Sequence, residues 1–245
     1  MTLLVACGLQ REAAIIARPG WVVVAGGGDA VRLERELEAA VERGGVRAVL
    51  SCGVAGALDP ALKAGDVVLG SLFSGEGRSP GLQGAAPTTL DPGLRRGTLE
   101  EWLARHLPDA HRGCIIGADS IIASAPEKAV LYAKTDAIAV DMESHIAARV
   151  AERHSLPFAI LRAISDSADH ALPPAALVGM KPDGGVALGA VLASLARDPR
   201  QLPALIRTGR DANAGFKAIA QAVGTINCRL LADHLLTGQP PHDTL

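Results

Sequence analysis

The amino-acid sequence predicts a three-layer α/β fold, with a central mixed but mostly parallel sheet and helices on both faces. Hydrophobic residues make up 49% of the 245 residues but aromatic residues only 2%, so the core must consist mainly of Ala, Val, Leu and Ile. Such side chains suit buried parallel strands covered by helices. Short apolar runs also alternate with amphipathic segments as far as about residue 170. This alternation is typical of α/β folds.

The expected strands are short apolar runs that end at glycine or at polar residues. They cover residues 3–7, 21–25, 46–52, 66–72, 114–122, 137–140 and 157–164. Gly53 to Gly56 is expected to form a turn after the third run. The glycines at 26–28 lack the spacing of a dinucleotide-binding loop, so they predict a strand-to-helix turn and no nicotinamide cofactor.

The expected helices have recognisable starts. Asp29 caps the first, whose apolar positions recur every three or four residues until Gly44 and Gly45 end it. Ser124 and Glu127 have the spacing of a capping box. Three more helices are expected over residues 94–107, 143–153 and 213–236. Residues 74–93 carry repeated Gly and Pro, which predicts a long loop. This loop could cover the substrate, form a dimer contact or be disordered.

Charge and cysteine content exclude several classes of protein. The formal net charge is −2 and no basic run is present, which argues against a nucleic-acid partner. The four cysteines lack CxxC spacing, so we expect reduced core residues and no metal site. No signal peptide or membrane-spanning stretch is recognisable. The sequence therefore predicts a cytoplasmic chain folded as one domain over residues 1–245, with an apolar helical extension from about residue 170 and no cofactor.

Three carboxylates lie at the ends of predicted strands or at the start of a predicted helix. In an open sheet, these are the positions that surround the ligand site. Glu12 comes after the first strand, Glu143 opens a helix and Asp166 follows a strand. Cleavage of an N-glycosidic bond develops positive charge on the sugar and negative charge on the leaving base. Such a site needs an acid beside the base and a carboxylate beside the sugar. A lone carboxylate after a strand is more often a helix cap, so the argument depends on all three together.

Three motifs in these positions resemble those of the purine nucleoside and uridine phosphorylase superfamily. The resemblance is strongest to its methylthioadenosine and adenosylhomocysteine nucleosidase branch and covers roughly residues 3 to 169. It implies the nucleoside-phosphorylase-like fold and an enzyme that cleaves a purine nucleoside. The motifs are Gly53-Val54-Ala55-Gly56-Ala57-Leu58, Val140-Asp141-Met142-Glu143-Ser144 and Arg162-Ala163-Ile164-Ser165-Asp166-Ser167-Ala168-Asp169.

The resemblance assigns roles to the matched residues. Asp166 is implied to be the general acid that protonates a ring nitrogen of the purine, with Ser165 positioning it. Glu143 is implied to bridge the 2′ and 3′ hydroxyls of the ribose, and Met142 to pack against the sugar. Glu12 matches the residue that activates the attacking water, with Arg162 nearby. The remaining substrate-binding positions implied are Gly53, Val54, Ala55, Ile121 and Ile122, the last through its backbone.

Two departures from the family pattern leave the nucleophile open. Val54 stands where the family has a hydroxyl in the glycine turn, and Ile121 stands where an aromatic side chain stacks on the purine. Phosphate could replace water, and Arg11, Arg18 and Arg78 are basic residues without an assigned role. The chain lacks the Gly-Asp-Pro-x-Arg phosphate motif of the hexameric phosphorylases, which favours hydrolysis.

The C-terminal part resembles a second group, the hopanoid-associated phosphorylases. The matching segments are His170 to Pro174, Met180 to Gly185 and Ala214 to Lys217. This resemblance implies adenosylhopane as substrate, with adenine released and a ribosyl or phosphoribosyl hopane left. The apolar residues 171–196 are then expected to form a lipid channel, although they could equally be core or a dimer face.

The sequence is also compatible with other functions. One is a general methylthioadenosine or adenosylhomocysteine nucleosidase, and another is a catalytically silent nucleoside-binding protein. Related enzymes are commonly dimers, so the resemblance implies a homodimer. A lipid-linked substrate further implies transient, peripheral contact with a membrane.

Overall fold

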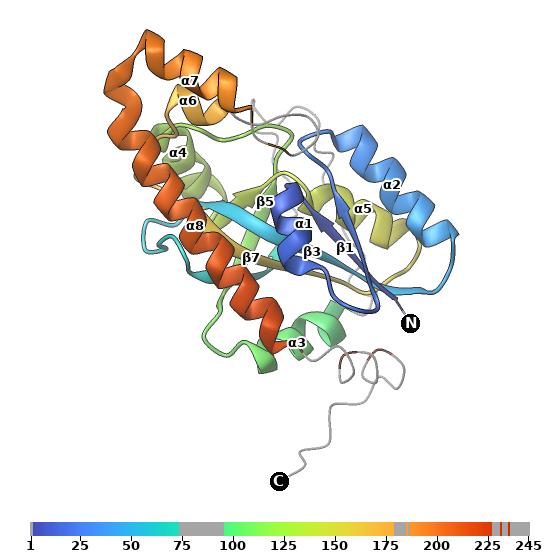
Figure 1. Ribbon diagram of the computed structural model, residues 1–245. Coiled ribbons are helices and arrows are strands. Elements are labelled where there is room, and N and C mark those ends of the chain that lie inside the picture. The colour runs from blue at the N-terminus through green and yellow to red at the C-terminus, as the bar shows by residue number, and fades with distance from the viewer. Residues whose placement is uncertain are drawn as a thin grey trace.

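The computed structural model describes residues 2–73, 96–178, 185, 187–226, 231 and 235. A mixed, mostly parallel seven-stranded sheet runs through the molecule (Figure 1) in the order β2-β1-β3-β6-β5-β4-β7, and β7 also pairs with β3. Only the β3–β6 and β4–β7 pairs are antiparallel among the pairings of the described strands. The strands are β1 (Thr2–Cys7), β2 (Trp21–Ala25), β3 (Val46–Ala57), β4 (Val67–Leu72), β5 (His111–Gly117), β6 (Ala139–Asp141) and β7 (Phe158–Asp166).

Helices cover both faces of this sheet, as the sequence predicts. The longest, α8, lies across one face together with α1 and α3, whereas α2 and α5 lie on the other (Figure 1). The helices are α1 (Gln10–Ile16), α2 (Ala30–Glu42), α3 (Arg96–His106), α4 (Ala125–Thr135), α5 (Ser144–Arg153), α6 (Pro174–Leu177), α7 (Leu188–Arg197) and α8 (Leu202–Thr225), with a 3-10 turn, η1, at Pro199–Gln201.

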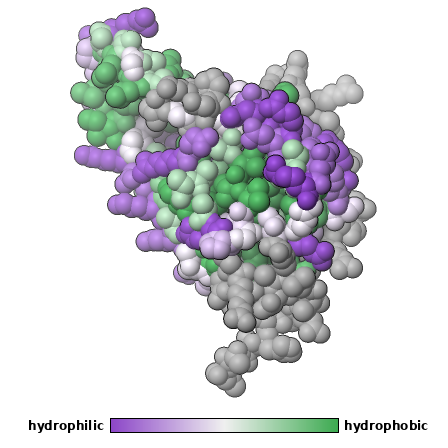
Figure 2. All heavy atoms as spheres, turned by 45° about the vertical axis from the view of Figure 1, so that its right-hand side comes forward, coloured by the Kyte–Doolittle hydropathy of each residue, from purple (hydrophilic) through white to green (hydrophobic). Residues whose placement is uncertain are grey.

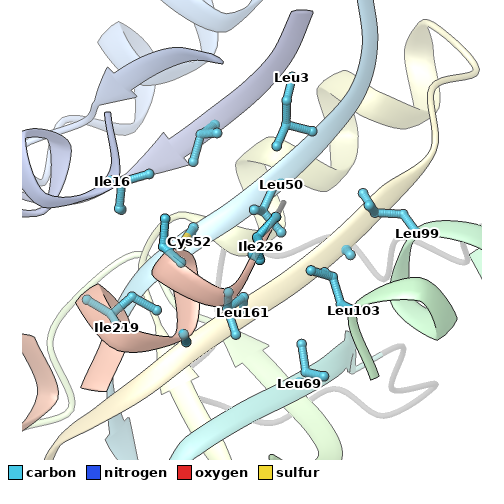
Figure 3. Packing of buried hydrophobic residues seen from close by; sticks show 14 of the residues in the cluster. Leu3, Ile16, Leu50, Cys52, Leu69, Leu99, Leu103, Leu161, Ile219 and Ile226 are labelled. Carbon is cyan, nitrogen blue, oxygen red and sulfur yellow. The ribbon is translucent and has the colours of Figure 1, made fainter. Parts of the chain in front are cut away.

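The two faces of β1 illustrate how the sequence builds the layers. Leu3 and Val5 belong to the cluster under α1, α3 and α8, and Leu4 and Ala6 belong to the cluster under α2 and α5. Successive side chains of a strand point to opposite faces, so a continuous apolar run is what a strand with helices on both sides requires. Figure 3 shows the first cluster, in which leucine and isoleucine side chains from strands and helices pack together.

The structure corrects several predicted boundaries. The expected turn at 53–56 is the continuation of β3, because it stays paired with β7 and then with β6 as far as Ala57. The strand expected over 114–122 is shifted to His111–Gly117; beyond it, Ala118 donates its N–H to the carbonyl of Asp141 and the chain leaves the sheet. Helix α1 is an element that the sequence analysis missed.

The C-terminal helix also differs from expectation. It begins at Leu202, well before residue 213, with Pro203 in its first turn, where a proline is tolerated, and it ends at Thr225. The predicted caps Asp29 and Ser124 are confirmed, since each accepts a backbone N–H from the first turn of its helix.

The loop expected over residues 74–93 lies outside the described residues, as do 179–184 and most of 227–245. None of the described helices is long and apolar enough to span a membrane.

Contact between α8 and β7 depends on a glycine. A Cβ atom at Gly215 would lie 2.8 Å from the carbonyl oxygen of Ile164, so the helix or the strand would have to move. We expect Gly215→Ala to lower the free energy of unfolding by about 1–3 kcal/mol, the usual cost of overpacking. A Cβ atom at Gly209, on the same helix, would meet no described atom within 4 Å apart from the neighbouring backbone of its own helix. Thermal melts should show a lower Tm for Gly215→Ala and a slightly higher one for Gly209→Ala, because alanine favours a helix by about 1 kcal/mol. Equal shifts for the two variants would contradict the packing argument.

Candidate active site

A pocket opens where β1, β3, β6 and β7 end, and helices α6 and α8 close its other side. Parallel strands bring their carboxyl ends to one edge of a sheet, which is where such folds bind ligands. Nearly all site residues expected from the sequence meet here; those that line the pocket are Glu12, Val54, Ala55, Ile121, Ile122, Met142, Glu143, Ser165 and Asp166. Gly53 and Arg162 lie behind this lining, not in it.

Glu12 is a buried carboxylate held entirely by backbone amides. Its Oε2 accepts the N–H groups of Gly8 and Leu9 at 2.8 and 2.6 Å, and its Oε1 accepts that of Val54 at 2.7 Å. A Cβ atom at Gly53 would lie 2.6 Å from Oε1, so only glycine leaves room for this carboxylate. Burial raises the pKa of Glu12, and Arg162 and the amides oppose that shift. A buried carboxyl with a raised pKa can take up a proton near neutral pH.

Arg162 neutralises the acidic groups from behind the pocket. It is fully buried, with Nε 3.0 Å from Asp141 Oδ2 and Nη1 3.3 Å from Glu143 Oε2. Its Nη2 donates to Ser51 Oγ at 2.6 Å. Burial alone lowers the pKa of Arg162, but the surrounding carboxylates outweigh it and raise the pKa above its ordinary value. The guanidinium therefore stays charged and positions the carboxylates instead of touching a ligand.

Glu143 faces the pocket at the start of α5. Asp141, two residues earlier, fixes this turn by accepting the N–H groups of Glu143 and Ser144 at 2.9 and 2.7 Å, as an aspartate at a helix start does. The pKa of Glu143 is raised to about 8, chiefly by burial, with Asp141 and Glu12 adding to the shift and Arg162 opposing it. Both carboxyl oxygens can accept hydrogen bonds from hydroxyl groups of a ligand.

Asp166 ends β7 and forms an ion pair that the sequence did not reveal. Its Oδ2 accepts a hydrogen bond from Lys128 Nζ at 2.5 Å, and its Oδ1 lies 3.1 Å from Ser165 Oγ. Lys128, on α4, is fully buried and also donates to the carbonyl oxygens of Ser167 and His170. The lysine therefore holds both the carboxyl group of Asp166 and the segment that follows it.

The rest of the pocket is mostly apolar, with Ser120 and Thr208 as its polar residues. Ile121 and Ile122 contribute from the segment before α4, and Leu172, Leu177 and Phe216 contribute from the side of α6 and α8. The polar groups are thus concentrated at the strand ends, opposite an apolar wall. Such a pocket suits a ligand with a polar sugar-like part and apolar parts on either side.

Sequence reasoning missed the residues that support the site from behind. Lys128 is 38 positions from Asp166 along the chain, and no local pattern links the two. Asp141 lies two and three residues before Glu143 and Ser144, whose N–H groups it accepts, and this short spacing is the one signal that could have revealed its role. Of the cysteines, Cys7 and Cys52 are buried, and burial raises the pKa of the Cys52 thiol to about 12. No group of three or more potential metal ligands occurs within the described part of the chain.

Curated proteins with similar sequences are nucleosidases by name. A 5′-methylthioadenosine/S-adenosylhomocysteine nucleosidase of Staphylococcus saprophyticus is 32% identical over 130 residues, which cover 49% of this chain and 57% of the relative. The corresponding protein of an Exiguobacterium species is 30% identical over 135 residues, 49% of this chain and 56% of the relative. The chain thus spans little more than half the length of these curated relatives.

Solved structures share the fold over nearly the whole chain. An S-adenosylhomocysteine nucleosidase from Streptococcus pyogenes superposes with a TM-score of 0.62 at 18% identity and covers 98% of both chains. A futalosine hydrolase of Helicobacter pylori gives 0.56 at 18% identity, over 92% of this chain and 98% of its own. The sequence pattern of the phosphorylase superfamily matches residues 8–183, which is well over half of the chain. The chain therefore belongs to the phosphorylase superfamily.

Proposed function

We propose that this chain cleaves the N-glycosidic bond of an adenine nucleoside and releases adenine. The observation that carries the proposal is a single pocket whose lining holds Glu12, Glu143 and Asp166 together, with an apolar wall opposite. The curated relatives are nucleosidases of two adenine nucleosides by name, which supports adenine as the base.

The geometry supports a simple division of roles. Glu143 binds the ribose hydroxyls and stabilises positive charge on the sugar as the bond from its anomeric carbon to the base breaks. The bonding electron pair goes to the base, and Asp166 donates a proton to a purine ring nitrogen. Water attacks the anomeric carbon and gives its proton to Glu12. The products are adenine and a sugar that carries a hydroxyl group at C1′.

Water fits this pocket better than phosphate. Neither lysine nor arginine occurs among the described residues that line it, whereas four carboxylates do. Arg162 already pairs with Asp141 and Glu143 behind the lining. Arg11 stacks on the Phe216 ring at 4.1 Å and donates to Asn213, and Arg18 donates to backbone carbonyls. Arg78 lies outside the described residues. A phosphate dianion would therefore meet repulsion without a compensating cation.

The finer proposal concerns the group at the 5′ position. The wall formed by Leu172, Ala176, Leu177, Ala212 and Phe216 is apolar, which favours a nucleoside with a bulky apolar 5′ substituent such as adenosylhopane. Methylthioadenosine and adenosylhomocysteine are the second candidates, favoured by the names of the curated relatives. A silent nucleoside-binding protein is disfavoured, because it would not need buried carboxylates of raised pKa.

The test is adenine release by the purified chain from adenosylhopane and from methylthioadenosine, each with and without phosphate. We expect phosphate-independent release from both substrates, with the higher kcat/KM for the lipid substrate. Release only from methylthioadenosine would replace the lipid proposal with the general nucleosidase. Strict phosphate dependence would overturn the role of water, and release from neither substrate would overturn the proposed cleavage.

Lys128 is expected to act as a positioning residue for Asp166. A carboxyl group that carries its proton on Oδ1 can still accept a hydrogen bond from the lysine at Oδ2. After proton transfer, the ammonium group of the lysine stabilises the carboxylate that is left. Lys128→Met keeps the aliphatic volume but removes this support. We expect kcat for adenine release to fall by about 10–100-fold, corresponding to loss of a charge-assisted hydrogen bond, with KM little changed.

Two controls separate this role from a purely structural one. A 4-nitrophenyl riboside needs no protonation of its leaving group, so Lys128→Met should cleave it almost as fast as the unaltered chain does. Lys134→Met changes an exposed lysine on the same helix and should leave both rates unchanged. Equal losses on both substrates would show that Lys128 only maintains the fold.

Binding should strengthen as pH rises, because the pKa of Glu143 is raised to about 8. Below that pH the carboxyl group is neutral, and above it the carboxylate accepts stronger, charge-assisted hydrogen bonds from the ribose hydroxyls. Calorimetry with 7-deazaadenosine, which lacks the nitrogen that Asp166 would protonate, should show affinity rising about tenfold between pH 6.5 and 9. A 2′,3′-dideoxy analogue should show no such trend. A flat profile for 7-deazaadenosine would contradict the proposed contact.

A further inference from the structure

Helix α7 and the start of α8 present apolar side chains that the described protein does not cover. None of the ten residues of α7 is buried by the parts of the chain that the structure describes. Leu188 and Leu192 of α7 are 64% and 58% exposed, and Leu202 and Ile206 of α8 are 46% and 47% exposed. Figure 2 shows apolar side chains gathered at this protruding upper end of the molecule. We refer to residues 188–210 as the arm.

The arm is also basic, in contrast to the chain as a whole. It contains four arginines, at 197, 200, 207 and 210, against the single Asp198, whereas the whole chain carries a net charge of −2. All four arginines are exposed, and no ion pair of theirs is found among the described residues. Successive helical residues are about 100° apart, so Arg210 lies only about 40° from Ile206 around α8. Basic and apolar groups therefore share one exposed face.

We infer that the arm is a docking surface for a bilayer that contains anionic lipids. Leucine and isoleucine side chains enter the boundary between headgroups and acyl chains, and flanking arginines reach the lipid phosphates. A second copy of this chain fits less well. In a two-fold dimer the same patch faces itself, which would bring the arginines of both copies together. The charge of the arm is complementary to an anionic surface and not to itself.

The arm continues directly into the wall of the pocket. Leu177 of α6 and Thr208 of α8 line the pocket, while Leu177 is itself partly exposed and Val178 beside it is exposed. Docking through the arm would therefore place the apolar side of the pocket next to the bilayer. A lipid-linked nucleoside could then enter without its apolar group crossing water, which gives the proposed lipid substrate a route to the site.

The test is co-flotation of the full chain with vesicles of phosphatidylcholine, with and without phosphatidylglycerol. We expect binding to the anionic vesicles that weakens at high salt. The double variant Leu192→Glu/Ile206→Glu should bind at least about tenfold more weakly, because two large apolar side chains no longer enter the lipid. Arg207→Gln/Arg210→Gln should lose most of the salt dependence. Val31→Glu, at an apolar position of α2 that is 78% exposed, is the matched control and should bind as the unaltered chain does.

The readout requires no turnover, so its failure is distinct from failure of the proposed cleavage. All variants should retain the unaltered rate of adenine release from a small water-soluble substrate. Absence of vesicle binding by the unaltered chain would overturn the inference, as would equal binding by the Leu192→Glu/Ile206→Glu variant. If sedimentation shows a dimer that this variant dissociates, and no vesicle binding occurs, the arm is a contact between copies and the lipid surface is wrong.

Discussion

Asp166→Asn is expected to lower kcat for adenine release by about 10²–10⁴-fold, the usual contribution of a general acid. Asparagine keeps the shape of the side chain and its neighbours Lys128 and Ser165, but its amide does not transfer a proton to the leaving base. Substrate binding depends on the sugar and on the apolar walls, so KM should change little. Steady-state kinetics with methylthioadenosine or adenosylhopane, whichever the chain cleaves, measures both effects.

Two controls make this prediction specific. Asp169→Asn alters a carboxylate three residues away whose side chain is 70% exposed, and it should leave kcat unchanged. The 4-nitrophenyl riboside, whose leaving group departs as a stable anion, should be cleaved by Asp166→Asn at nearly the unaltered rate. If Asp166→Asn lowers kcat equally for both substrates while its Tm is unchanged, Asp166 supports the pocket without acting as the acid.

The sequence predicts the layers of this fold well because a strand buried on both faces is apolar over several consecutive residues. The run from Leu3 to Cys7 is apolar on both faces, as a strand between two helical layers must be, and the structure buries each of these residues. Glu12, Glu143 and Asp166 could be brought together because parallel strands end at one edge of the sheet. Each of these predictions depends on a local pattern, namely an apolar run or the position of one carboxylate beside the end or start of its own element.

What the sequence did not predict depends on contacts between distant segments. Gly53 and Gly56 suggested a turn, yet they remain in β3, where a Cβ atom would press on Glu12 and Asp166 respectively. Their absence of side chains serves the carboxylates and does not break the strand. Lys128 on α4 supplies the cation for Asp166 only through tertiary packing. The start of α8 was misplaced because Pro203 suggested a break in the chain, whereas it lies in the first turn of the helix, where a proline is tolerated.

Glu12→Ala should have an effect as large as that of Asp166→Asn, through the other half of the reaction. Removing the carboxylate removes the acceptor of the water proton and should lower kcat by about 10²–10⁴-fold. It also leaves three backbone N–H groups, of Gly8, Leu9 and Val54, pointing into the vacated space. Those groups are suited to bind a small carboxylate. Added formate should therefore raise kcat of Glu12→Ala at least about tenfold, the size of effect that one added charge-assisted hydrogen bond provides.

The formate effect separates catalysis from support, since buried N–H groups without an acceptor also reduce stability. Glu12→Ala should melt at a lower temperature than the unaltered chain, and formate should recover part of that loss too. Asp166→Asn has no such vacated space and should not respond to formate. If formate restores the Tm of Glu12→Ala but leaves kcat low, Glu12 only ties the end of β1 to β3. The water must then lose its proton to another group, such as Glu143, which flanks Gly8 together with Glu12.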